Sequence, residues 1–119
     1  SVQVKKNLRQ LGIGPEIIRR VSIAMYEGEI NMVIHANGGS ADVTVTEDQI
    51  IIVLSDHGPG IKDISLAMRE GYSTAPDNVR SLGFGAGMGL PNMKRYTDDM
   101  KIESEVGVGT TVTMVVNLT

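Results

Sequence analysis

An uninterrupted apolar segment near the middle of the chain sets the first limit on its fold. Residues 50–54 are Ile-Ile-Ile-Val-Leu, and a short run of this kind between turn-forming residues is typical of a central β-strand. Before the Glu47-Asp48 turn, residues 41–46 alternate between apolar and polar side chains, as in a half-buried strand. The two segments predict a hairpin whose second strand, 49–55, lies in the middle of a sheet.

A long helical pattern precedes this hairpin. It runs from about Glu16 to Ala36, with Pro15 in its first turn and Asn37-Gly38-Gly39 after its end, which are favourable start and stop signals for a helix. Further patterns predict helices at 61–70 and 90–97, a long Gly-, Ser- and Pro-rich loop at 71–89, and strands at 100–105 and 110–118. This order predicts an α+β fold, a two-layer α/β sandwich with helices on one face of a mixed, mostly antiparallel sheet.

The composition is that of one globular domain covering residues 1–119. With 41 % hydrophobic but only 3 % aromatic residues, the core has to be filled by Ile, Val, Leu and seven Met. The net charge of −3 disfavours nucleic acid as a partner because phosphate binding needs a basic surface. The sequence has no Cys, which excludes disulfides and thiolate metal sites. It shows no signal peptide and no apolar run long enough for a membrane span, so we expect a cytoplasmic protein without a membrane partner.

Polar side chains form a stripe along the long helix. Glu27, Asn31 and His35 are four residues apart and therefore lie on one side. Glu27 and Asn31 fall between two apolar stripes, where a carboxylate and an amide need partners. A cleft holding a metal ion and an activated nucleophile would supply them, and so would a buried polar network or exposure in a groove. His35 fits a structural role near the helix end, where the helix dipole favours a cation. The apolar stripes are Ile17, Val21, Met25, Gly28 and Met32, and Ile23, Ile30 and Ile34.

An acidic residue ends the central strand and is followed by two glycines, Asp56-His57-Gly58-Pro59-Gly60. A carboxylate at the end of a strand can accept a hydrogen bond from an exocyclic amino group. The two glycines let the backbone approach a flat ligand such as a purine. A tight turn with an aspartate cap explains the same residues without any ligand.

Alternating glycines precede the helix at 90–97, at positions 83, 85, 87 and 89. Backbone N–H groups at a helix start attract anions, and glycines would let them reach phosphate oxygens. A flexible loop is the alternative, and the segment is not a P-loop sequence. Lys94 could add a positive charge. Gly109-Thr110 begins the last strand after a glycine turn, for which an ordinary β-turn is a sufficient explanation.

Together, the order and spacing of these four segments resemble the motifs of the GHKL, or Bergerat-fold, ATPases. Glu27-x-x-x-Asn31 is similar to the N box and Asp56-x-Gly58-x-Gly60 to the first glycine box. Gly85-x-Gly87-x-Gly89-Leu90 is similar to the second glycine box, and Gly109-Thr110 to the threonine motif of the last strand. Residues 56–64, 67–68, 71–74 and 89–95 are further similar to the anti-sigma-factor and switch-protein serine kinases, which have a histidine-kinase-like ATPase domain.

The resemblance implies a role for each matching residue, with ATP and Mg²⁺ as cofactors. Glu27 would be the general base, and Asn31 would hold Mg²⁺ through its side-chain oxygen. Asp56 would accept a hydrogen bond from the adenine amino group. The other nucleotide-binding positions carried over are Gly58, Gly60 and Thr110 around the adenine, and Gly85, Gly87, Gly89, Leu90 and Lys94 around the phosphates, with Lys94 the weaker match.

The resemblance also implies a serine/threonine protein kinase that transfers the γ-phosphate of ATP to a STAS-domain partner of the anti-anti-sigma type. The alternative is a non-catalytic anti-sigma factor or switch module in which ATP only sets a conformation. Glu27 favours the kinase, because a pure binder needs no base beside Asn31. A sigma factor is a further partner in this family, whose members occur as monomers and homodimers. Two features depart from the family pattern: a longer lid at 75–80, and Gly28, a poor helix former that allows close packing.

Overall fold

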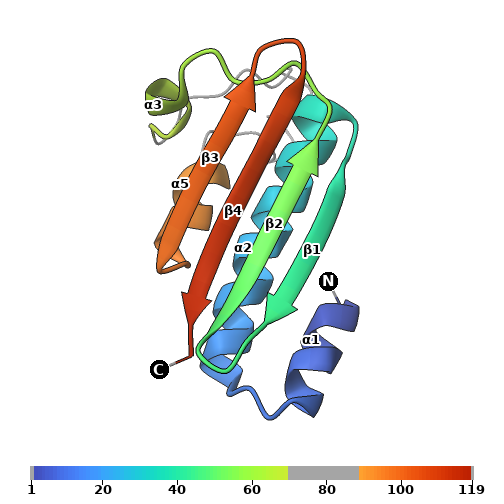
Figure 1. Cartoon of the computed structure of the whole chain (residues 1–119), viewed down its shortest axis with the longest axis vertical. Helices are drawn as coiled ribbons and strands as arrows, with labels where there is room; N and C mark the ends of the chain where they lie inside the picture. Colours follow the sequence, from blue (N-terminus) through green and yellow to red (C-terminus); the bar gives the residue numbers. More distant parts are fainter. Residues whose placement is uncertain (1, 70–88, 119) are drawn as a thin grey trace, which may run out of the picture.

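The computed structural model describes residues 2–69 and 89–118, which form two layers (Figure 1). One layer is a four-stranded sheet, and α2 and α5 lie against one of its faces. The helices are α1 (Val2–Gln10), α2 (Pro15–Ala36), α3 (Ile64–Ala67) and α5 (Gly89–Arg95). The strands are β1 (Ser40–Val45), β2 (Gln49–Asp56), β3 (Asp99–Glu105) and β4 (Gly109–Asn117). This arrangement confirms the predicted α+β sandwich.

The strands follow the order β1-β2-β4-β3, and each neighbouring pair is antiparallel. β2 therefore lies in the centre of the sheet, as its apolar run predicts. The inward side chains of the two central strands are buried: Ile50, Ile52 and Leu54 of β2, and Val112, Met114 and Val116 of β4. Together with buried Met25, Met32 and Met93, they form a core that uses Met where aromatic residues are scarce.

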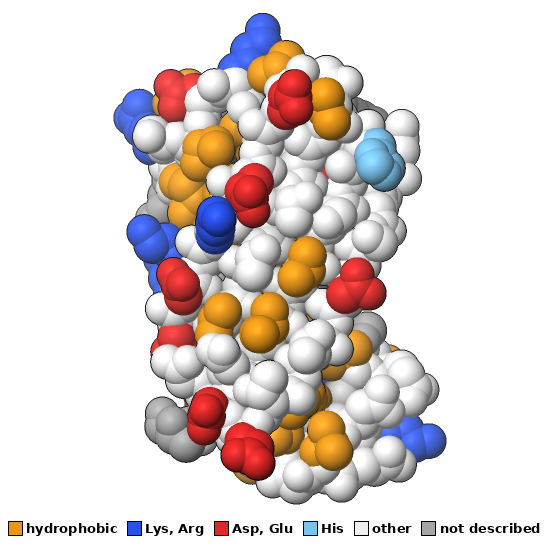
Figure 2. Space-filling model, in the orientation of Figure 1, with side chains coloured by type: hydrophobic (Ala, Val, Ile, Leu, Met, Phe, Trp, Pro, Cys, Tyr) orange, Lys and Arg blue, Asp and Glu red, His pale blue; other side chains and the backbone are white. Residues whose placement is uncertain are grey.

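No described helix covers the opposite face of the sheet. Ile51 and Val53 of β2 are half-buried there, and Val115 of β4 lies opposite Ile51. Figure 2 shows this face, with separate hydrophobic side chains in its middle and acidic side chains around them. The apolar run of β2 is thus divided between a buried and a partly exposed face, as expected for an antiparallel sheet covered on one side.

α2 begins and ends at the predicted signals. Pro15 is its first residue, and Asn37 follows its end with a left-handed backbone, φ 59°. The N–H of Gly38 donates to the carbonyl oxygen of Met32 at 2.9 Å, which satisfies one of the last carbonyl groups of the helix. Although α2 contains 22 residues, neither it nor any other described helix is long and apolar enough to cross a membrane.

The buried side of α2 differs in part from the prediction. Buried residues are Ile18, Val21, Ala24, Met25, Gly28 and Met32. The second apolar stripe, formed by Ile23, Ile30 and Ile34, is only half-buried. Glu27 and Asn31 consequently lie at the edge of the core rather than between two buried surfaces, so one side of their stripe is accessible to a ligand.

Two short helices also differ from the sequence prediction. The sequence patterns do not predict α1, in which only Leu8 is buried. They predict a helix from 61 to 70, whereas α3 contains four residues. Asp63 caps α3 by accepting the N–H of Leu66 at 3.1 Å. The N–H of Ile61 instead donates to Ser104 Oγ at 2.8 Å, 43 residues away, and local periodicity carries no signal for such a contact.

Candidate functional site

Asp56 ends β2 and joins the following loop to the last strand. Its Oδ1 accepts hydrogen bonds from the backbone N–H groups of Gly58 at 2.9 Å and Thr110 at 3.2 Å. The first bond closes the tight turn anticipated from the sequence, and the second links β2 to β4, where Asp56 pairs with Thr110. Both hydrogen bonds from described residues go to Oδ1, which leaves Oδ2 able to accept from another donor.

The glycines after Asp56 lie where a side chain would not fit. A Cβ on Gly58 would be 2.5 Å from the Cβ of Ala36 at the end of α2. A Cβ on Gly60 would be 2.5 Å from the carbonyl oxygen of Glu105, and Gly60 has a φ of +79°, which other residues rarely adopt. The loop is therefore packed closely between α2 and the β3–β4 turn, and this packing by itself requires both glycines.

A pair of hydroxyl groups supports the same end of the sheet. Thr110 is 9 % exposed, and its Oγ1 lies 2.9 Å from Ser104 Oγ of β3. Ser104 donates to the carbonyl oxygen of Gly109 at 3.2 Å and accepts from the N–H of Ile61 at 2.8 Å, so Thr110 supplies the proton between the two hydroxyls. Ser104 belongs to none of the sequence motifs. The sequence could have indicated Ser104 only through its position in β3. It lies two residues after Ile102 and therefore on the same, inward side of the strand.

The start of α5 lies against the middle of α2. A Cβ on Gly89 would be 3.8 Å from both Asn31 Oδ1 and Glu27 Oε2. Glu27, Asn31 and Gly89 are each partly exposed, and none of the described buried side-chain N or O atoms lacks a hydrogen-bond partner. The structure thus brings Gly89, the first residue of α5 and the last glycine of the second glycine box, to the carboxylate of Glu27 and the amide of Asn31 at the solvent-accessible edge of the core.

Gly28 allows β2 and α5 to pack close to α2. A Cβ at this position would overlap Leu54 Cδ1 of β2 and lie 3.2 Å from Met93 Cε of α5. A poor helix former in the middle of α2 therefore allows both β2 and α5 to pack close to its backbone. This confirms close packing as the reason for the glycine after Glu27.

His35 extends the polar stripe towards Asp56. The imidazole is half-buried, and this burial lowers its pKa, while the negative charge of nearby Asp56 acts in the opposite direction. The net lowering favours a neutral imidazole at pH 7. Loss of hydration is thus the larger of these two effects on His35. Because His35 interacts with the charge of Asp56, the C-terminal end of the polar stripe on α2 lies near the Asp56 loop.

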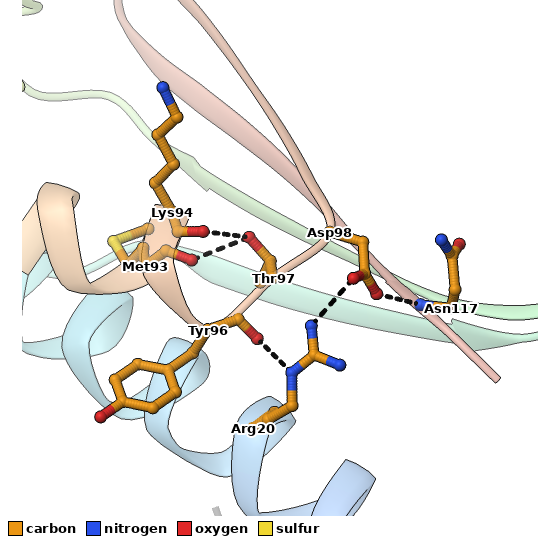
Figure 3. A network of polar contacts seen from close by, with 7 residues as sticks. All are labelled: Arg20, Met93, Lys94, Tyr96, Thr97, Asp98 and Asn117. Atoms are coloured by element: carbon orange, nitrogen blue, oxygen red, sulfur yellow. Dashed lines mark hydrogen bonds and ion pairs between the residues drawn. The ribbon is translucent and has the colours of Figure 1, made fainter. Parts of the chain in front are cut away.

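The remaining predicted positions lie in different environments. The side chain of Leu90 is 7 % exposed and belongs to the core. Lys94 is exposed in the last turn of α5, and in Figure 3 its side chain extends away from the Arg20 contacts. Gly85, Gly87 and the insertion at 75–80 lie outside the described residues. The described ranges contain no group of three His, Asp or Glu side chains that could hold a metal ion.

Known proteins with similar sequences or folds fit this arrangement. A family profile for the histidine kinase-like ATPase domain matches residues 2–116. The chain is 31 % identical to the serine/threonine-protein kinase RsbT of Bacillus subtilis, over 92 % of this chain and 80 % of that protein. It is 34 % identical to the anti-sigma F factor of Clostridium novyi, over 95 % and 80 % of the two chains, and 38 % identical to that of Clostridium acetobutylicum, over 83 % and 69 %.

The fold comparison agrees with the sequence comparisons. The mycobacterial sensor histidine kinase MprB superposes with a TM-score of 0.61 at 18 % identity, over 84 % of this chain and 71 % of that one. At this identity the likeness concerns the fold alone. The family profile, in contrast, covers almost the whole chain and confirms the resemblance seen in the sequence motifs. The chain belongs to the histidine kinase-like ATPase domain family.

Proposed function

We propose that the chain is an ATP-dependent serine/threonine protein kinase of the anti-sigma regulatory type. Its similarity to proteins named serine/threonine-protein kinase and anti-sigma F factor supports this activity. The observation that carries the proposal is the proximity of Gly89 to Glu27 and Asn31, which combines a carboxylate, an amide oxygen and a helix start. The substrate is a Ser or Thr of a STAS-domain protein of the anti-anti-sigma type, and a sigma factor is a further partner.

The adenine of ATP binds at Asp56 in this proposal. The Oδ2 atom accepts a hydrogen bond from the exocyclic amino group, while Oδ1 remains bonded to the N–H groups of Gly58 and Thr110. Gly60 lets the loop pass close to the ring, and the Thr110–Ser104 hydroxyl pair holds this end of β4 in place. The fixed orientation of the carboxylate favours ligands with an amino group over those with a carbonyl at that position.

The phosphates and Mg²⁺ bind beside the start of α5. Asn31 Oδ1 is an oxygen ligand of the kind that Mg²⁺ prefers, and Mg²⁺ commonly takes its other ligands from phosphates and water. Gly85, Gly87 and Gly89 supply backbone N–H groups to the phosphates, Leu90 anchors α5 in the core, and Lys94 adds positive charge.

Glu27 acts as the general base in this proposal. Its Oε2 lies beside Gly89, next to the proposed phosphate position. The hydroxyl oxygen of the partner Ser or Thr bonds to the γ-phosphorus, the bond to the bridging oxygen of ADP breaks, and Glu27 accepts the hydroxyl proton. Because phosphoryl transfer depends mainly on positioning and charge neutralisation, removing the base slows transfer more than it weakens ATP binding.

The test is transfer of label from [γ-³²P]ATP, with Mg²⁺, to the STAS-domain proteins of the same genome. We expect label on a partner Ser or Thr, and a decrease of about 10²- to 10⁴-fold with Glu27→Gln. Glu29→Gln is the matched control, because it changes a carboxylate two residues along the same helix and should leave transfer unchanged.

The same assay separates the kinase from a non-catalytic module. ATP binding that persists with no label on any STAS-domain partner would support an anti-sigma factor or switch protein whose ATP only sets a conformation. Transfer that survives Glu27→Gln at the wild-type rate would contradict the role of Glu27 as the base while leaving kinase activity intact.

A further inference from the structure

α5 is held by α2 at both of its ends. Its first residue, Gly89, lies beside Glu27 and Asn31. Tyr96, which follows its last residue, accepts a hydrogen bond from Arg20. The two helices therefore run antiparallel. Arg20 and Glu27 are seven residues apart, which places them on the same side of α2 and separates them by about 10 Å along the axis. α5 contains seven residues and is therefore also about 10 Å long.

The contacts at the C-terminal end of α5 form the network drawn in Figure 3. Arg20 Nε donates to the carbonyl oxygen of Tyr96 at 3.1 Å, and Arg20 Nη2 lies 3.1 Å from Asp98 Oδ1. The other carboxylate oxygen of Asp98, Oδ2, accepts the N–H of Asn117 at the end of β4 at 2.6 Å. One guanidinium group thus connects α2 to the residues after α5 and, through Asp98, to the central strand of the sheet.

This ion pair is better placed than an ordinary surface pair. The side chains of Arg20 and Asp98 are 23 % and 33 % exposed, and each also makes a hydrogen bond to backbone. The neighbouring pair Arg19–Glu16 is 54 % and 68 % exposed, and such pairs contribute little. The chain therefore contains, at successive positions of one helix, one arginine that joins three elements and one that is largely solvated.

The body of α5 connects its two ends through a hydrogen bond and a buried side chain. Thr97 Oγ1 donates to the carbonyl oxygen of Met93 at 2.8 Å, which ties the second residue after the helix to its second half. Met93 is 1 % exposed and packs against the α2 backbone at Gly28. Bonded and packed residues therefore connect the C-terminal end of this short helix to its first residue, Gly89.

We infer that Arg20 is a positioning residue for the nucleotide phosphates, acting through α5. Through Tyr96 and Asp98 it fixes the height and tilt of α5, and so keeps the backbone at Gly89 beside the carboxylate of Glu27 and the amide of Asn31. Arg20 itself does not contact the reacting atoms. The inference rests on the proposed function, since it assumes that ATP phosphates bind at the start of α5.

The test compares ATP and adenosine binding in Arg20→Ala and wild type, by calorimetry for Mg-ATP and by NMR titration for adenosine. We expect the Kd for Mg-ATP to rise at least about tenfold, because hydrogen bonds from the start of α5 to the charged phosphates would be weakened or lost. The Kd for adenosine should stay the same, because the Asp56 end of the site is unchanged. A variant that is folded but merely less stable would bind both ligands more weakly to the same extent, or would bind both with unchanged affinity.

Arg19→Ala is the matched control. Its guanidinium lies 5.6 Å from the centroid of the Tyr96 ring and pairs with Glu16 rather than with Asp98, so the ATP affinity should fall much less than in Arg20→Ala and the adenosine affinity should stay at the wild-type value. Arg20→Lys keeps the charge but cannot donate to Tyr96 and Asp98 with the same fork, and we expect an intermediate loss of ATP affinity.

Asp98→Asn gives a second, milder variant in case Arg20→Ala does not fold. The amide oxygen can still accept the N–H of Asn117, while the charge that attracts Arg20 is lost, so ATP affinity should fall and adenosine affinity should not. Wild-type ATP affinity in both Arg20→Ala and Asp98→Asn would overturn the positioning role and leave the proposed function standing. No binding of ATP by the wild type would overturn the proposed function itself.

Discussion

His35 makes the stability of the chain sensitive to pH near neutrality. Its pKa is lowered in the folded state, chiefly because burial disfavours the charged imidazole, and only partly offset by the charge of Asp56. The unfolded chain therefore binds a proton at a pH where the folded chain does not. By linkage, the contribution of His35 to stability is complete above the unfolded pKa of about 6.5 and is lost as the pH falls below it.

We expect the free energy of unfolding, measured by urea denaturation, to decrease as the pH falls from 7 to 5. His35→Gln removes the titrating group and should flatten this dependence. His57 lies exposed in the loop after Asp56, so His57→Gln is the matched control and should keep the wild-type slope. An unchanged slope in His35→Gln would show that another group is responsible for the pH dependence.

At the scale of elements, Gly28 sets how closely α2, β2 and α5 pack. Gly28→Val would place side-chain atoms where Leu54 Cδ1 and Met93 Cε already lie. We expect a loss of about 1–3 kcal/mol in the free energy of unfolding, together with weaker ATP binding, because α5 would be pushed away from α2. Tyr26→Val puts the same β-branched side chain on the exposed side of α2 and should change stability by about 0.5 kcal/mol or less. Equal losses in the two variants would contradict the packing role.

The elements that could be predicted from sequence are those with strong local patterns. The apolar run of β2, the alternation in β4 and the stop signal after α2 place these elements within about one residue of their observed ends. α1 could not be predicted, because six of its nine residues are polar and only Leu8 is buried. α3 begins later than predicted because Asp63, with an extended backbone, caps it by accepting the N–H of Leu66.

At the scale of the whole molecule, the candidate site also has features that local sequence patterns predict and features that depend on distant contacts. Spacing within one segment is enough to put Glu27 and Asn31 on one helix face and to give Asp56 a tight turn. The relation between segments depends on tertiary structure. The bond from Thr110 to Asp56 spans 54 residues and that from Arg20 to Tyr96 spans 76, and neither side chain carries a local signal for its partner.

The described part of the molecule presents two regions along one side of α2. The Asp56 loop, with His35 and Thr110, lies at the end of the central strands. The start of α5, with Glu27 and Asn31, lies closer to the middle of α2. In the proposed function, one ATP molecule binds both regions at once, with its adenine at the Asp56 end of the sheet and its phosphates at the start of α5.

Calorimetric titration of Mg-ATP into wild type and Asp56→Asn tests that claim most directly. Asparagine can keep Oδ1 as acceptor for the N–H groups of Gly58 and Thr110, but it replaces the second acceptor oxygen with an amide donor. We expect the wild type to bind one ATP per chain and Asp56→Asn to lose about 1–3 kcal/mol of binding free energy, roughly 5- to 150-fold in Kd. No binding by the wild type, or equal affinity in a folded Asp56→Asn, would contradict it.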